Sequence, residues 1–124
     1  HPMFGTVTEW YYRWLGGIRP IPAYPGFEEF ILAPFAPKGL NAVQCTYVSP
    51  FGEIKSEWKR KKGGELQYEL NIPDGSRARV HISLDSRQKI TLVEDQKSGE
   101  RITTGDINSG RFVLTGGSYL IVVE

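Results

Sequence analysis

The hydrophobic residues near the start of the chain follow the period of an α-helix. Between Phe4 and Ile18 they recur at intervals of three and four residues, the spacing of one apolar helix face. Thr6 and Glu9 have the spacing of a capping box, in which two side chains bond free backbone amides of the first turn. A glycine pair and then three prolines prevent further helix. The pattern predicts one amphipathic N-terminal α-helix, followed by an extended connector over residues 19–26.

After Gly26 the hydrophobic period changes to two, which is typical of strands with one buried face. Glycine, proline, aspartate and serine separate the alternating segments, as in β-turns. The candidate strands are residues 27–33, 42–49, 53–60, 65–72, 77–84, 89–94, 111–115 and 118–123. We therefore expect an all-β fold, an antiparallel β-sandwich of jelly-roll type with about eight strands, preceded by the N-terminal α-helix.

Composition and charge exclude several classes of partner. The 124 residues suffice for one core, and 15 Lys and Arg against 14 Asp and Glu leave a net charge of only +1. The longest basic run, residues 59–62, adjoins a glycine pair and is typical of a solvated hairpin tip. No segment approaches the roughly 18 apolar residues of a membrane span. The sequence predicts neither a nucleic-acid partner nor a membrane partner.

Motifs for metal, phosphate or covalent chemistry are missing from the sequence. The one cysteine, Cys45, excludes an internal disulfide and a four-cysteine zinc site, and the alternation around it predicts a buried thiol. No phosphate loop, histidine pair at metal spacing or nucleophile elbow occurs. His81 lies on the polar side of an alternating segment, as a solvated histidine would. We expect no metal and no cofactor.

Glu9 supports two interpretations that do not exclude each other. The structural one is the capping box, with the carboxylate also favoured by the helix dipole. The functional one is a catalytic base, because Trp10 and its aromatic neighbours could stack on the apolar face of a sugar beside it. These aromatic residues occupy more than one helix face, so the helix needs a second packing surface. Without that surface, the exposed rings favour self-association.

Two long segments resemble a known enzyme family. Residues 1–18 read HPMFGTVTEWYYRWLGGI and resemble the last catalytic-domain segment of bacterial α-L-rhamnosidases. Residues 25–27 (PGF), residues 49–58 (SPFGEIKSEW) and the Ile72-Pro73 pair resemble the opening of their C-terminal β-sandwich domain. The resemblance is close from residue 1 to about residue 84 and looser to residue 124.

The resemblance implies a fold and an activity for the parent enzyme. Family members have a large α/α barrel for catalysis and hydrolyse terminal α-L-rhamnosides with inversion, which uses one carboxylic acid and one carboxylate base. Glu9 matches the general base, and Trp10 and His1 are candidate substrate-binding residues. The general acid belongs to upstream sequence that this chain lacks. Relatives often have a histidine after the Pro-Gly-aromatic turn, where this chain has Glu28 and Glu29.

The organisation implied is a closing helix and connector of a missing α/α barrel over residues 1–26 and a C-terminal β-sandwich domain over residues 27–124. The implied partners are a rhamnoside substrate and the remaining barrel, and the isolated chain is expected to be inactive. An alternative is a free-standing carbohydrate-binding module with Trp10, Trp14 or Trp58 as stacking platform. A third is a generic structural or interaction domain, which does not explain the aromatic helix.

Overall fold

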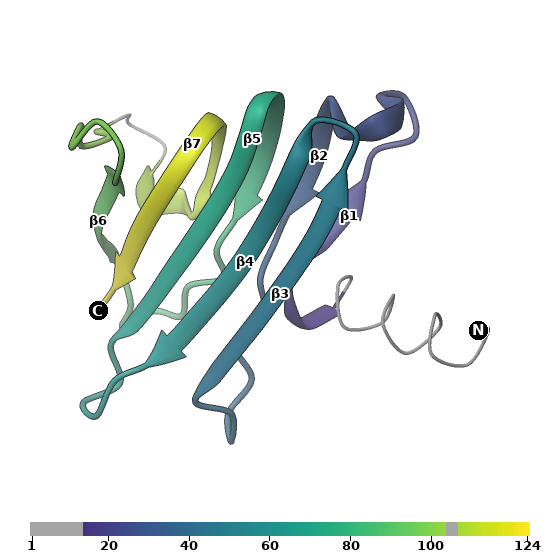
Figure 1. The fold of residues 1–124 in the computed structure, drawn as a ribbon. Coiled ribbons are helices and arrows are strands. Elements are labelled where there is room, and N and C mark those ends of the chain that lie inside the picture. Colours follow the sequence, from purple (N-terminus) through teal and green to yellow (C-terminus); the bar gives the residue numbers. More distant parts are fainter. Residues whose placement is uncertain (1–13, 104–106) are drawn as a thin grey trace.

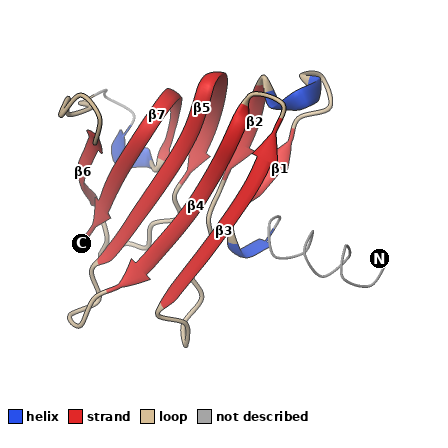
Figure 2. Cartoon of the chain, viewed as in Figure 1, coloured by secondary structure: helices blue, strands red, loops and turns tan. Residues whose placement is uncertain are grey.

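The computed structural model describes residues 14–103 and 107–124, and these form mainly β-strands (Figure 2). The predicted β-rich fold is confirmed. The elements in chain order are β1 (Ile18–Pro20), the short 3-10 turn η2 (Pro25–Phe27), β2 (Glu29–Leu32), β3 (Ala42–Ser49), β4 (Gly52–Arg60), β5 (Leu66–His81), β6 (Ile90–Asp95), the turn η3 (Ile107–Ser109) and β7 (Arg111–Val123).

The seven strands of the described residues belong to one hydrogen-bonded sheet. Five of them follow the order β1-β2-β5-β4-β3, while β7 pairs with β5 and β6 pairs with β7. All pairs are antiparallel except β2 and β5, which run parallel. The expectation of a purely antiparallel sheet is therefore wrong. Alternation reports which face of a strand is buried and not its direction, so the sequence pattern could not reveal this pair.

Two long strands fold the sheet into two layers (Figure 1). Both β5 and β7 bend near the middle, where their pairing shifts register between Ile72 and Arg77. A Cβ on Gly116 would lie 2.9 Å from the Cα of Asp74, so the two bends touch and only glycine fits there. The front layer contains β3, β4, β6 and one half each of β5 and β7. The rear layer contains β1, β2 and the other two halves.

The count of about eight strands is corrected by these bends. Residues 65–72 and 77–84 were predicted as separate strands but are largely the two halves of β5. Residues 111–115 and 118–123 are likewise the two halves of β7. Turn residues in the middle of a pattern mark either a chain reversal or a bend, and sequence alone does not separate the two.

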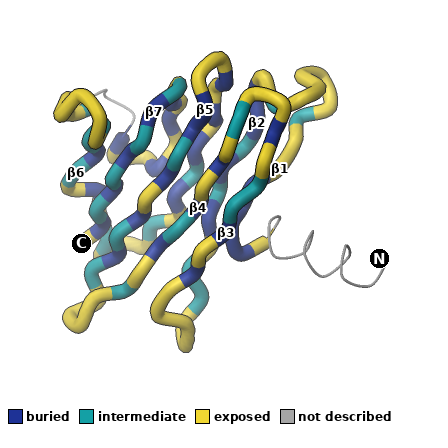
Figure 3. The backbone as a smooth tube through the Cα atoms, in the orientation of Figure 1, coloured by how far each residue is buried: buried dark blue, intermediate teal, exposed yellow. Residues whose placement is uncertain are grey.

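The hydrophobic core lies between the two layers, as Figure 3 shows by the buried positions that alternate along each strand. Cys45 is buried, as predicted, and desolvation raises the pKa of its thiol. The hairpin tip predicted beside the basic run is also confirmed, since residues 61–64 connect β4 to β5 and are exposed. The largest fully buried hydrophobic side chains are Phe30, Leu32, Ile54, Leu70, Ile72, Ile82, Ile121 and Val123.

Most of the predicted N-terminal helix, residues 4–13, lies outside the described residues. Its predicted last apolar residue, Ile18, is instead the first residue of β1, which pairs with β2. The connector of residues 19–26 is thus partly a strand. Leu15 and Ile18 are buried in the same core as the sheet. The predicted domain boundary at residues 26 and 27 stays a prediction.

Candidate functional site

The three residues predicted from the sequence to act on substrate, Glu9, Trp10 and His1, all lie outside the described residues. What is described is the segment that follows Glu9 in the chain. It contains Trp14, which is 42% exposed, and Leu15, which is 4% exposed. The structure therefore bears on how this segment is held and on the surface beside it.

Residues 15–17 are tied to the sheet by three hydrogen bonds. The amide of Phe35 donates to the carbonyl of Leu15 (3.1 Å), and the amide of Ala33 donates to the carbonyl of Gly17 (2.9 Å). The fully buried hydroxyl of Ser56 donates to the carbonyl of Gly16 (2.6 Å). Because a buried carbonyl without a donor is costly, these bonds fix the path by which the chain enters the sheet.

A groove of about 950 Å³ lies beside this entry point, on the outer side of the rear layer. One cross-strand row crosses it, because Ile31 is opposite Arg19 and Arg79, and Arg79 is also opposite Val113. We call this surface the rear groove. The other side chains used in the argument below are Trp14, Phe35, His81 and Arg111.

The aromatic rings of Trp14 and Phe35 lie together in the rear groove. Their centroids are 5.2 Å apart with the planes tilted by 43°, which is a favourable arrangement for an aromatic pair. Both rings remain more than one-third exposed, at 42% and 38%. Large exposed rings that meet in a groove are typical of a contact surface rather than of an ordinary solvated face.

The rear groove has a positive electrostatic character. Burial, then Arg111 and then Arg19, lower the pKa of His81 below its ordinary value of 6.5. Folded His81 therefore binds a proton less tightly than in the unfolded chain. Its contribution to folding is complete above that ordinary value and is lost as the pH falls below it. The sequence interpretation of His81 as merely solvated missed these neighbours, which are brought together by the pairing of β1, β2, β5 and β7.

Glu29 lies at the edge of the same layer and compensates part of this charge. It is only 8% exposed, and its carboxylate pairs with Arg79 and, at 3.7 Å, with Arg77. Glu29 is one of the two glutamates that follow the turn of residues 25–27. In this chain the position serves an ion pair across the parallel strands β2 and β5.

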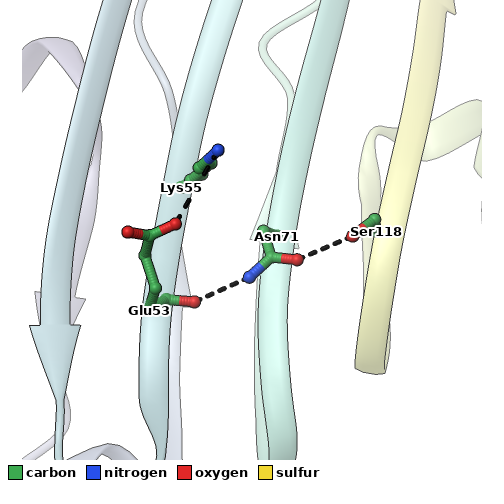
Figure 4. A network of polar contacts seen from close by, with 4 residues as sticks. All are labelled: Glu53, Lys55, Asn71 and Ser118. Carbon is green, nitrogen blue, oxygen red and sulfur yellow. Dashed lines mark hydrogen bonds and ion pairs between the residues drawn. The ribbon is translucent and has the colours of Figure 1, made fainter.

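The outer surface of the front layer has a different chemistry, shown in Figure 4. The side-chain amide of Asn71 donates to the carbonyl of Glu53 and accepts from the hydroxyl of Ser118, both at 2.7 Å. Lys55 lies 3.7 Å from the carboxylate of Glu53. Acidic, basic and amide side chains are mixed here. This surface is suited to solvent.

The aromatic residues of the strands do not form an exposed platform. Trp58 is 2% exposed and belongs to the core, so it cannot stack on a sugar. Tyr47 is partly buried and packs against Phe27, with ring centroids 5.0 Å apart. Among the described tryptophans this leaves Trp14 accessible to a ligand.

The described residues contain neither a candidate metal site nor a membrane-spanning helix. In residues 14–103 and 107–124 no group of three histidine, cysteine or acidic side chains could hold a metal ion. No helix in that part of the chain is long and apolar enough to cross a membrane.

Comparison with solved structures supports the fold. The chain superimposes over its full length on 14% of the α-L-rhamnosidase of Dictyoglumus thermophilum, with a TM-score of 0.71 and 26% identity. It also superimposes over its full length on 11% of a Streptomyces avermitilis α-L-rhamnosidase crystallised with L-rhamnose, with a TM-score of 0.68 and 20% identity. The second likeness, at this identity, concerns the fold alone.

Sequence comparison leads to the same proteins. An α-L-rhamnosidase of Formosa agariphila is 24% identical over 98% of this chain, which corresponds to 13% of the relative. The chain thus spans about one-eighth of the length of that relative. Residues 17–97, more than half of the chain, match the family model described as the bacterial alpha-L-rhamnosidase C-terminal domain. The chain therefore belongs to the bacterial α-L-rhamnosidase C-terminal domain family.

Proposed function

We propose that this chain is the C-terminal part of an α-L-rhamnosidase, in which its sheet supports the catalytic domain and performs no chemistry itself. The observation that carries the proposal is the family match over residues 17–97, in a chain that spans only a small share of its relatives. Residues 27–124 would be the β-sandwich that the family resemblance implies. Residues 1–26 would be the closing segment of an α/α barrel.

The proposed reaction is hydrolysis of a terminal α-L-rhamnoside with inversion. In such a reaction one carboxylic acid protonates the leaving oxygen while a carboxylate activates a water on the opposite face of the sugar. Glu9 is the proposed carboxylate, with Trp10 and His1 beside the sugar. The acid would come from the rest of the barrel. Inverting enzymes hold their two carboxyl groups roughly 6.5–9.5 Å apart, which leaves room for the attacking water. The 124 residues alone would then be inactive.

A free-standing carbohydrate-binding module is the second candidate, favoured by the exposed pair of Trp14 and Phe35 in the rear groove. Against it, a stacking platform works best as a flat row of rings, and Trp58 is buried.

Titration of the 124-residue chain with L-rhamnose, followed by tryptophan fluorescence, separates the two functions. We expect no saturable change, because a complete sugar site would need the barrel. An unrelated sugar serves as the control ligand. A saturable response that is specific to L-rhamnose and is lost in Trp14→Leu would favour the binding module instead.

A further inference from the structure

The two outer surfaces of the layered sheet differ in their side chains. One has the composition of a solvent-exposed face and the other that of an interface. On the front layer a cross-strand row contains Lys55, Asn71 and Ser118, and the neighbouring row places Glu57 opposite Glu69. Such a mixture of charges and amides is typical of a face exposed to water. The rear groove contains arginine, histidine, aromatic and aliphatic side chains, and no described Asp or Glu lines it.

The composition of the rear groove is that of a protein–protein contact. Arginine, tryptophan and phenylalanine are enriched in the centres of interfaces, whereas lysine, aspartate and glutamate are depleted. Val113, the third residue of β7, is 54% exposed, whereas its neighbours Phe112 and Leu114 are buried. Trp14 and Phe35 extend this apolar surface to the point where the chain enters the sheet. Covering the groove would remove several large apolar side chains from water at once.

The position at which the described chain begins indicates which domain covers the groove. Trp14 is the first described residue, and it lines the groove. A domain that is covalently joined to the chain at this point is held near the groove at a local concentration in the millimolar range. A second copy of the chain would need to reach that concentration in solution.

Charge complementarity adds the chemistry of the partner. Arg19, Arg79 and Arg111 line the groove, and Glu29 pairs with Arg79 from the groove's edge. The remaining excess of positive charge suits a surface that presents carboxylates, because opposite potentials across an interface speed docking and fix its register.

We propose that the rear groove is the docking surface for the rest of the catalytic domain in the full-length enzyme, and that this domain presents acidic side chains to the groove's arginines. The inference rests on the proposed function, and it specifies which face of the sheet makes the contact. The front layer then faces solvent.

Two exposed valines on opposite layers provide a matched test. Val113→Glu places a carboxylate in the rear groove, and Val48→Glu places one on β3 of the front layer, where the side chain is 74% exposed. In the isolated 124-residue chain we expect both variants to unfold within a degree or two of the unchanged chain, because surface substitutions have small effects. In the full-length enzyme we expect Val113→Glu to lower the melting temperature by several degrees and Val48→Glu to leave it unchanged.

Equal melting temperatures of the two variants in the full-length enzyme would overturn the inference. It would also be overturned if the isolated chain formed a dimer, detected by light scattering, that Val113→Glu abolished while the full-length enzyme remained unaffected. Arg111→Glu is a second variant, which changes the charge of the groove and leaves the core intact. We expect it to lower the melting temperature of the full-length enzyme, as Val113→Glu does. Rhamnoside hydrolysis is measured separately: its absence together with a Val113→Glu effect would overturn the proposed function and not the docking surface.

Discussion

Replacing Glu9 by glutamine in the full-length enzyme is expected to lower kcat on a rhamnoside by about 10²–10⁴-fold, the usual contribution of a general base. Glutamine is informative because it also fits the last position of a capping box. The variant would therefore remove the carboxylate and keep a side chain that suits the predicted capping position. Steady-state kinetics on an aryl α-L-rhamnoside, with the melting temperature measured in parallel, checks the expectation.

Glu28→Gln is the matched control for this prediction. Glu28 is an exposed glutamate at the end of η2, outside the proposed catalytic segment. We expect its replacement to leave kcat unchanged. Near-normal turnover by Glu9→Gln would exclude Glu9 as the general base, which would then have to be another residue.

Gly17→Ala is expected to destabilise the 124-residue chain by about 2–5 kcal/mol, the sum of a left-handed backbone penalty and an overpacking penalty. Gly17 has a φ of 69°, and a Cβ there would lie 2.0 Å from the carbonyl oxygen of Ala33. That oxygen belongs to backbone, so the clash can be relieved only by moving the chain entry away from β2. Urea unfolding of the variant and of the unchanged chain measures the difference.

Gly63→Ala supplies the control, because Gly63 also has a positive φ of 52° but would place its Cβ in open space. We expect it to cost no more than the left-handed penalty of about 1–2 kcal/mol. If both variants lost the same stability, the close approach of residues 17 and 33 would not be what holds the N-terminal segment on the sheet.

The sequence predicted the strands well where burial alternates without interruption. Residues 42–49 were predicted as a strand and form β3, in which buried residues are separated by more exposed ones. The predictions failed where a long-range contact decides. Ile18 belongs to an apolar helical pattern, yet pairing with Leu32 makes it part of a strand. The partner strand supplies this hydrogen-bonding arrangement, and no local propensity reports it.

The candidate site was only partly predictable for the same reason. Glu9 and Trp10 were singled out by local spacing and by resemblance to a family, both of which can be read along the chain. The rear groove joins Arg19, His81 and Arg111, which are separated by up to 92 residues. Each of these residues taken alone is typical of a solvated surface. Their proximity follows from the pairing of β1, β2, β5 and β7.

The most direct test of the account compares hydrolysis of an aryl α-L-rhamnoside by the full-length protein and by the 124-residue chain under the same conditions. The account predicts turnover by the full-length protein, with the first-formed rhamnose in the inverted configuration by NMR, and no turnover by the chain. Hydrolysis by the chain alone, or a full-length protein without rhamnosidase activity, would contradict it.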